Sequence, residues 1–152
     1  MPTEELEGAA RAIIADNRYM TLGTADEEGA PWVSPVWCAP SGYREFFWVS
    51  SPDARHSHNV AARPEIAIVI FDSRVPAGSG QGVYMSAIAE EVSDAELERG
   101  IEIFSQRAEA QGLRAWTRED VTPPARHRLY CATASEHFVL DKGDHRVPVS
   151  LE

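Results

Sequence analysis

The fold of this chain is decided by residues 31–39, Pro-Trp-Val-Ser-Pro-Val-Trp-Cys-Ala, and by residues 45–50, Glu-Phe-Phe-Trp-Val-Ser. Both segments are rich in aromatic and β-branched residues, which favour β-strands. A third such segment lies at residues 19–24, and polar turns at residues 26–29 and 40–42 separate the three. Turns this short join neighbouring strands in antiparallel fashion. The first third of the chain therefore predicts three antiparallel strands.

Helices are predicted in three places by apolar spacing and by end signals. They cover the segment that ends near Asn17, residues 51–63 and residues 93–112. The second helix begins with a serine cap followed by proline at its first position. The third begins with a capping box made by Ser93 and Glu96. We expect all three helices to pack at the periphery of the sheet that the strands form.

Further strands are predicted in the second half of the chain, at residues 66–71 and at the start of residues 83–92. Residues 128–134 and 137–140 predict a closing strand or hairpin arm. The segment 66–71 is almost continuously apolar, as in a strand that is buried on both faces. The glycine-rich segment 76–82 opens a strand rather than a helix, so it does not fit a dinucleotide-binding loop. Strands joined by short turns, with helices between some of them, predict an antiparallel barrel with peripheral helices.

Composition narrows the class of protein further. The chain has 152 residues, enough for one core of ordinary size, and we expect a single domain over residues 1–152. The formal net charge of −10 disfavours nucleic acid as a partner. No apolar run approaches the roughly 18 residues that would span a bilayer, and the acidic first residues do not resemble a secretory signal. We expect a cytoplasmic protein that has no membrane or nucleic-acid partner.

Metal and amine chemistry receive little support from the sequence. Cys38 and Cys131 are far apart and predict buried free thiols rather than a disulfide or a metal site. His56 and His58 lie in a helical segment, where side chains two positions apart diverge by about 200°. All basic residues except Lys142 are arginine, so anion binding falls to arginine, histidine and backbone amides. We expect no metal site and assign no catalytic residue.

The strongest candidate for a ligand site combines an aromatic strand with a turn that suits an anion. Residues 32–37 supply the aromatic strand, and Ser50 ends the next one. The following helix begins near Arg55 and His56, whose charge-assisted donors join the free amides of a helix start. A flat apolar surface beside a phosphate-binding turn is the expected result.

In these segments the chain resembles the FMN-binding split β-barrel family of pyridoxamine 5′-phosphate oxidase, from about residue 19 to residue 92. The resemblance rests on five motifs in a fixed order, namely Gly-x-Pro-Trp-Val-Ser-Pro-Val-Trp (29–37), Phe-Trp-Val-Ser-Ser (47–51), Ala-Arg-His-Ser-His-Asn-Val (54–60), Arg-Pro-Glu-Ile-Ala-Ile-Val-Ile-Phe (63–71) and Gln-Gly-Val-Tyr-Met-Ser-Ala-Ile-Ala-Glu (81–90). It implies a mainly β, α+β fold, a six- to seven-stranded antiparallel split β-barrel with peripheral helices.

The resemblance also implies a cofactor site shared by two subunits of a homodimer. In the family, the flavin lies along the second strand, and its phosphate is held where the third strand meets the next helix. Carried over by position, the ring would contact Val33, Ser34, Pro35, Val36 and Trp37. The phosphate would contact Ser50, Ser51, Arg55 and His56, and Gln81 and Gly82 would reach the partner's flavin.

The implied function is an FMN-dependent oxidoreductase that acts on a small molecule. Trp32 and Trp37 stand where pyridoxamine phosphate oxidases carry basic residues, so the resemblance implies a related flavoprotein rather than that oxidase. Family members that bind the deazaflavin F420 or haem, including non-catalytic binding modules, remain the alternatives. The acidic net charge disfavours the anionic tail of F420. Trp37, Trp48 and Tyr84 are candidates for shaping a substrate pocket.

Overall fold

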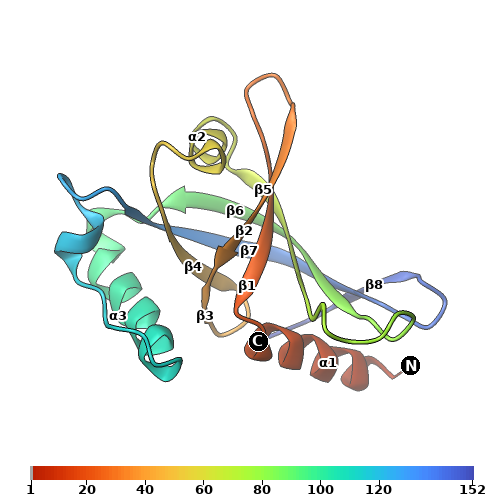
Figure 1. The fold of residues 1–152 in the computed structure, drawn as a ribbon. Coiled ribbons are helices and arrows are strands. Elements are labelled where there is room, and N and C mark those ends of the chain that lie inside the picture. Colours follow the sequence, from red (N-terminus) through yellow and green to blue (C-terminus); the bar gives the residue numbers. More distant parts are fainter. Residues whose placement is uncertain (1) are drawn as a thin grey trace.

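The computed structural model describes residues 2–152, which form eight strands, three α-helices and one 3-10 helix (Figure 1). The strands are β1 (Tyr19–Ala25), β2 (Pro31–Trp37), β3 (Ala39–Ser41), β4 (Glu45–Ser50), β5 (Glu65–Phe71), β6 (Gly82–Glu91), β7 (Arg128–Leu140) and β8 (Arg146–Val149). The helices are α1 (Thr3–Asp16), α2 (Arg55–Ala62), α3 (Asp94–Ala110) and the 3-10 helix η1 (Arg118–Val121).

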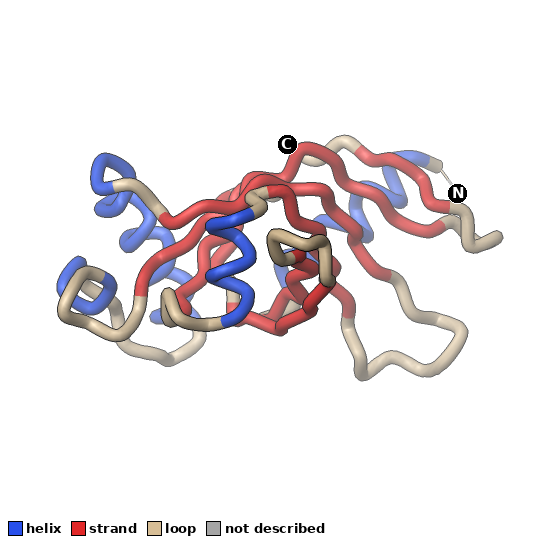
Figure 2. The backbone as a smooth tube through the Cα atoms, turned by 90° about the horizontal axis from the view of Figure 1, so that it is seen from above, coloured by secondary structure: helices blue, strands red, loops and turns tan. Residues whose placement is uncertain are grey.

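All strands belong to one antiparallel sheet. Seven of them follow the order β2-β1-β5-β6-β7-β4-β3, and β8 pairs with the C-terminal end of β7, residues 137–140. Figure 2 shows the strands curving together, with the helices at the periphery. This arrangement confirms the expected class, a mainly β split barrel with peripheral helices.

Each helix covers a different part of the sheet. In Figure 1, α2 lies at one end of the curved sheet, α1 at the other end and α3 to one side. Correspondingly, α2 contacts β1, β2 and β6, whereas α1 contacts β5, β6 and β8. The longer α3 packs on β3, β4 and β7. The side on which α3 packs is the side that carries the candidate site.

The hydrophobic core has two parts, one inside the curved sheet and one beneath α3. Trp48 belongs to the first, where it is 0% exposed and stacks on Tyr130 with 5.5 Å between ring centroids. In the second, Gly100 brings α3 close to the sheet, because a Cβ atom there would lie 2.8 Å from Leu129 and 3.1 Å from Phe47. The lack of a side chain at position 100 therefore fixes how near α3 stands to β4 and β7.

Several local predictions need correction. The helix predicted from Ser51 begins at Arg55, because residues 51–54 form a turn in which the Ser51 hydroxyl accepts from the Asp53 N–H. The helix at Ser93 exists, but among the described residues Ser93 makes no side-chain cap hydrogen bond, so the predicted capping box does not form. By contrast, the closing strand expected from residues 128–134 and 137–140 is present as one long strand, β7, which has a bulge opposite Ser86 and Ala87.

The two cysteines are free thiols, as their spacing in the sequence predicts. Cys38 is buried and Cys131 is half-buried. Burial raises the pKa of the Cys38 thiol to about 12 and that of Cys131 to about 11. Within residues 2–152, no helix has both the length and the apolar character that crossing a membrane requires.

Candidate functional site

A pocket of about 420 Å³ lies between the end of β2, the end of β4, the start of α2 and the inner side of α3. Its volume falls within the range of small-molecule sites. The loop that connects α3 to β7 closes the outer side. The lining comprises Tyr19, Pro35, Val36, Trp37, Val49, Ser50, His56, Phe104, Ala108, Leu113, Trp116 and His127. We call it the aromatic pocket.

The wall of the aromatic pocket is a row of rings that meet edge to face. Phe104 stands at 76° to Trp37, with 5.0 Å between centroids, and at 85° to Trp116, with 5.7 Å between centroids. His127 continues the row, at 81° and 6.0 Å from Trp116. Edge-to-face contacts of this kind are favourable beyond the area that they bury. The row thus gives the pocket a rigid aromatic wall drawn from β2, α3 and the loop.

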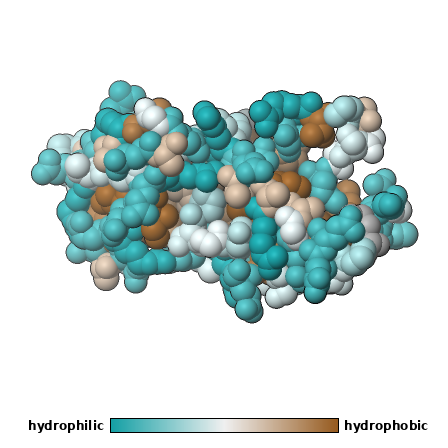
Figure 3. All heavy atoms as spheres, turned by 90° about the horizontal axis from the view of Figure 1, so that it is seen from below, coloured by the Kyte–Doolittle hydropathy of each residue, from teal (hydrophilic) through white to brown (hydrophobic). Residues whose placement is uncertain are grey.

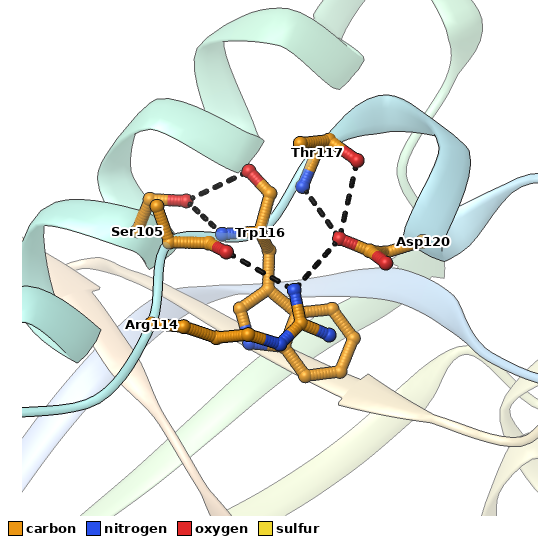
Figure 4. Close-up of polar contacts among 6 residues, drawn as sticks. Ser105, Arg114, Trp116, Thr117 and Asp120 are labelled. Atoms are coloured by element: carbon orange, nitrogen blue, oxygen red, sulfur yellow. Dashed lines mark hydrogen bonds and ion pairs between the residues drawn. The ribbon is translucent and has the colours of Figure 1, made fainter.

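Hydrogen bonds fix the orientation of this wall at both ends. The Nε1–H of Trp37 donates to Oε1 of Gln111 at 2.8 Å. At the other end, the Ser105 hydroxyl accepts from the Trp116 N–H at 2.9 Å and donates to the Trp116 carbonyl at 3.1 Å (Figure 4). Trp37 is therefore bonded through its side chain to the residue that follows α3, and Trp116 is bonded through its backbone to α3.

The outer face of the loop is held by a charged cluster. The Arg114 guanidinium lies 4.5 Å from the centre of the Trp116 ring and donates to Asp120 at 3.0 Å (Figure 4). Asp120 also accepts from the Thr117 N–H and hydroxyl. These donors lower the pKa of the Asp120 carboxyl, with the bond from Arg114 as the largest cause. The cluster holds Trp116 from the solvent side.

The polar end of the aromatic pocket is formed by Ser50 and His56. Ser50 Oγ lies 2.8 Å from His56 Nε2, a hydrogen-bond distance. Burial lowers the pKa of the His56 imidazole. Because the ordinary histidine pKa is already below 7, His56 is neutral at neutral pH. The pair therefore offers an uncharged donor and acceptor to a ligand.

The structure places Arg55 outside the aromatic pocket, at the first residue of α2. Its guanidinium lies 4.3 Å from the centre of the Trp32 ring. The pKa of the Asp26 carboxyl is lowered chiefly by the hydrogen bond from the Ala30 N–H, and the charge of Arg55 adds to this effect. Among the described residues, Ala54 precedes α2 at the N-cap position and makes no side-chain cap hydrogen bond. The first N–H groups of an α-helix have no partner within the helix.

The predicted site residues thus separate into groups. Pro35, Val36, Trp37, Ser50 and His56 meet at the aromatic pocket. Val33 is 67% exposed on the outer face of β2, and Ser34 is half-buried beside it. Ser51 and Arg55 lie in the turn and at the start of α2.

Gln81 and Gly82 lie elsewhere in the subunit. The Gln81 side chain donates to the Leu140 carbonyl at 2.6 Å and accepts from the N–H groups of Leu140 and Gly82. Strand register places Gly82 on β6, three strands from β2, or about 14 Å at ordinary strand spacing. These two residues and the aromatic pocket of the same subunit therefore do not form one site.

Of the three candidates for a substrate pocket, the structure brings only Trp37 to the aromatic pocket. Trp48 lies inside the sheet, and its large apolar ring is part of the core. Tyr84 is 38% exposed on the outer face of β6, where it borders a different hollow.

Sequence reasoning missed the half of the pocket that comes from α3 and the following loop. Phe104 lies in the helix predicted over residues 93–112, and Trp116 and His127 lie between that helix and the strand segment predicted from residue 128. One signal is present, because tryptophan is usually buried to a large extent. No pattern in the sequence indicates that Trp116 packs near Trp37.

The curved antiparallel sheet and the pocket beside its second strand define a split β-barrel protein. Residues 6–138 match the family model described as pyridoxamine 5′-phosphate oxidase, and the chain belongs to that family.

Known structures share the fold at low sequence identity. A heme binding protein from Mycobacterium smegmatis has a TM-score of 0.74 at 20% identity, covering 99% of this chain and 59% of its own. HutZ, the heme storage protein from Vibrio cholerae, has a TM-score of 0.65 at 21% identity, covering 89% and 92%. A putative pyridoxamine 5′-phosphate oxidase from Listeria innocua has a TM-score of 0.66 at 13% identity, covering 89% and 98%.

These likenesses concern the fold. The chain spans less than two thirds of the Mycobacterium smegmatis protein. No curated protein matches the chain.

Proposed function

We propose that the chain binds FMN and acts as a flavin-dependent oxidoreductase on a small molecule. The main support for the proposal is the position of α2. Among the described residues, its first turn has no side-chain cap hydrogen bond, and it lies next to the aromatic end of β2, since His56 of α2 and Trp37 of β2 line the same pocket. FMN has the same two parts, a planar ring system and a phosphate. When bound, it would supply hydride and electron transfer, while the protein supplies orientation and hydrogen bonds.

The turn between β4 and α2 fits a phosphate. A helix start presents free amides and the positive end of the helix dipole. Ser51 would add a hydroxyl donor, and Arg55 would donate from the first turn of α2. Ser50 and His56 bond to each other at the polar end of the aromatic pocket, so they would be left for a second ligand. Asp53 and Asp26 limit the site, because carboxylates repel an anion, so the phosphate would lie on the Arg55 side of the turn.

The outer row of β2 fits the flat ring. Val33, Pro35 and Trp37 alternate along one side of the strand and present an apolar surface, while Val36 points into the core. Such a surface would exclude water from one face of the flavin. This chain's residues would thus bind and orient the cofactor, and the account requires no acid or base from the protein.

We also propose that two copies associate through the outer face of the sheet. This face carries several exposed large apolar side chains, including Val33, Phe71, Tyr84 and Ile88. Val33 and Tyr84 line a hollow of about 380 Å³ whose lining also includes Gly23 and Ala67. By contrast, hydrophilic residues predominate on the face shown in Figure 3, where hydrophobic ones form separate small areas.

Pairing through the outer face supports the shared cofactor site. Phe71 and Gly82 are cross-strand partners at one end of that face. In a dimer, this end of one subunit would approach the flavin of the other. Gln81 and Gly82 would then contact the partner's cofactor. This arrangement agrees with their distance from the aromatic pocket of their own subunit, which is too large for one shared site.

Disrupting the outer face should separate the two copies. We expect Tyr84→Asp to convert a dimer into a monomer, because it places a charge in a desolvated apolar contact. Light scattering coupled to gel filtration measures the mass directly. Leu113→Asp is the matched control, since Leu113 is also exposed (53%) but lies on the loop after α3. A monomeric wild-type protein, or a Tyr84→Asp variant that stays dimeric, would refute this interface.

Haem is the second candidate ligand. The specific observation in its favour is that two imidazoles, those of His56 and His127, line an otherwise mostly apolar pocket. Neutral imidazole is a common ligand of haem iron. The Mycobacterium smegmatis and Vibrio cholerae proteins that share the fold are a heme binding and a heme storage protein. Under this alternative the chain would be a non-catalytic binding module. The deazaflavin F420 ranks lower, since the net charge of −10 opposes its anionic tail.

We propose that the protein works in the cytoplasm. Cys38 and Cys131 are free thiols, which a reducing compartment preserves.

A further inference from the structure

We infer that the aromatic pocket takes an uncharged, planar aromatic substrate of one or two rings, and that Trp116 determines the size it accepts. The inference rests on the proposed flavin function. It assigns the outer row of β2 to the cofactor and the pocket behind Trp37 to the substrate. Trp37 and Pro35 border both regions, so a substrate in the pocket would lie beside the edge of the flavin.

The lining of the aromatic pocket is made of uncharged side chains and two histidines. Among residues 2–152, no Arg, Lys, Asp or Glu side chain lines the pocket. Three arginines next to or near lining residues in the sequence are engaged elsewhere. Arg55 packs on the Trp32 ring, Arg114 packs on Trp116, and Arg107 donates to the carbonyls of Ala15 and Asn17. A charged substrate would lose its hydration here and gain no counter-ion, which is costly. The pocket therefore selects against ions.

The rings of the aromatic wall are arranged edge to face. Trp37, Phe104 and Trp116 stand nearly perpendicular to their neighbours in the row, so ring faces and ring edges are both presented to the space between β2 and the loop. Aromatic ligands bind such walls by offset stacking and by edge-to-face contact. Flexible aliphatic chains would gain less from them. A flat aromatic ring is the occupant that these contacts favour.

The polar end of the pocket offers hydrogen bonds to a substrate. Ser50 and His56, which bond to each other, both line the pocket. Because His56 is neutral at neutral pH, the pair matches a hydroxyl, a carbonyl or a ring nitrogen better than a carboxylate. A substrate with one such group would be oriented as well as bound.

Trp116 is the specificity residue because it forms the outer wall and is held in place. Its backbone is bonded twice to Ser105, and its ring is covered by Arg114. A wall fixed on both sides cannot yield to a larger ligand without breaking these contacts. Shortening the side chain at this position should open the pocket toward solvent.

Binding of 2-naphthol and 2-naphthalenesulfonate, measured by calorimetry on the full chain with and without FMN, tests the inference. The two probes share a ring system and differ in charge at neutral pH. We expect 2-naphthol to bind and the sulfonate to bind at least about tenfold more weakly. Equal affinity, or tighter binding of the sulfonate, would overturn the inference. This comparison needs no variant and so does not depend on the folding of a mutant.

Variants at position 116 test the role of the tryptophan. We expect Trp116→Ala to weaken 2-naphthol at least about tenfold through lost stacking area, and Trp116→Phe to retain most of the affinity. Unchanged affinity in a folded Trp116→Ala protein would refute the assignment.

The outcomes with FMN separate the two proposals. If 2-naphthol binds and FMN does not, the pocket survives and the flavin function fails. If FMN binds and 2-naphthol does not, the reverse holds. Direct competition between FMN and 2-naphthol would overturn the assignment of this pocket to the substrate.

Discussion

Replacing Trp48 with alanine is expected to lower the free energy of unfolding by about 3–5 kcal/mol, the usual cost of removing a buried aromatic side chain. The Trp48 ring is 0% exposed and stacks on Tyr130 inside the curved sheet. The strand that carries it, β4, is paired with β7 on one side and with β3 on the other, so a cavity there has little room to collapse. Urea unfolding followed by circular dichroism measures the loss.

Two other tryptophan variants serve as controls for this result. Trp48→Phe keeps most of the apolar volume and removes an Nε1–H that has no hydrogen-bond partner within the described residues, so its loss should be smaller. Trp32→Ala removes a ring that is 42% exposed and contacts Arg55, and we expect a loss of about 1 kcal/mol or less. A Trp48→Ala protein as stable as the wild type would contradict the placement of Trp48 in the core.

Replacing Arg55 with alanine is expected to weaken FMN binding by about 1.5–3 kcal/mol, or about 10- to 150-fold in the dissociation constant. This is the scale of hydrogen bonds to a charged group, and Arg55 is the only arginine that the proposal places at the phosphate. Titration followed by flavin fluorescence measures the constant. Riboflavin, which has no phosphate, should respond much less to the same substitution.

Further variants separate the contribution of Arg55 from a general effect of charge. Arg99→Ala removes the same charge from α3, where Arg99 pairs with Glu45, and should leave FMN binding unchanged. Arg55→Lys retains the charge but loses the planar fork that matches a phosphate, so an intermediate affinity is expected. An FMN dissociation constant unaffected by Arg55→Ala would remove Arg55 from the site.

The fold was largely predictable because its signals are local. The strands over residues 19–24 and 45–50 and the helix after Ser93 follow from composition, turns and periodicity, and the structure contains each of them. The short strands β3 and β8 were not predicted, since three or four residues carry too little pattern. The start of α2 was misplaced because Ser51 and Pro52 are equally suited to a turn, and the structure uses them in one.

The candidate site was only half predictable, because it depends on tertiary packing. Ser50 and His56 are six residues apart, and their proximity follows from the turn between a strand and a helix. Trp37 and Gln111 are 74 residues apart, and their hydrogen bond requires α3 to pack beside β2. Gly100 permits the close approach of α3, and no local pattern reveals that role. Likewise, Trp48 shares its composition signal with Trp37, and only the burial seen in the structure separates a core ring from a pocket ring.

The visible absorption spectrum of the freshly purified protein, followed by titration of the colourless fraction with FMN, decides whether the protein binds flavin. We expect the two-banded spectrum of a bound flavin, or saturable uptake of FMN that Arg55→Ala weakens. A Soret band would instead identify haem as the ligand. A colourless protein that takes up no FMN would contradict the proposed flavin function.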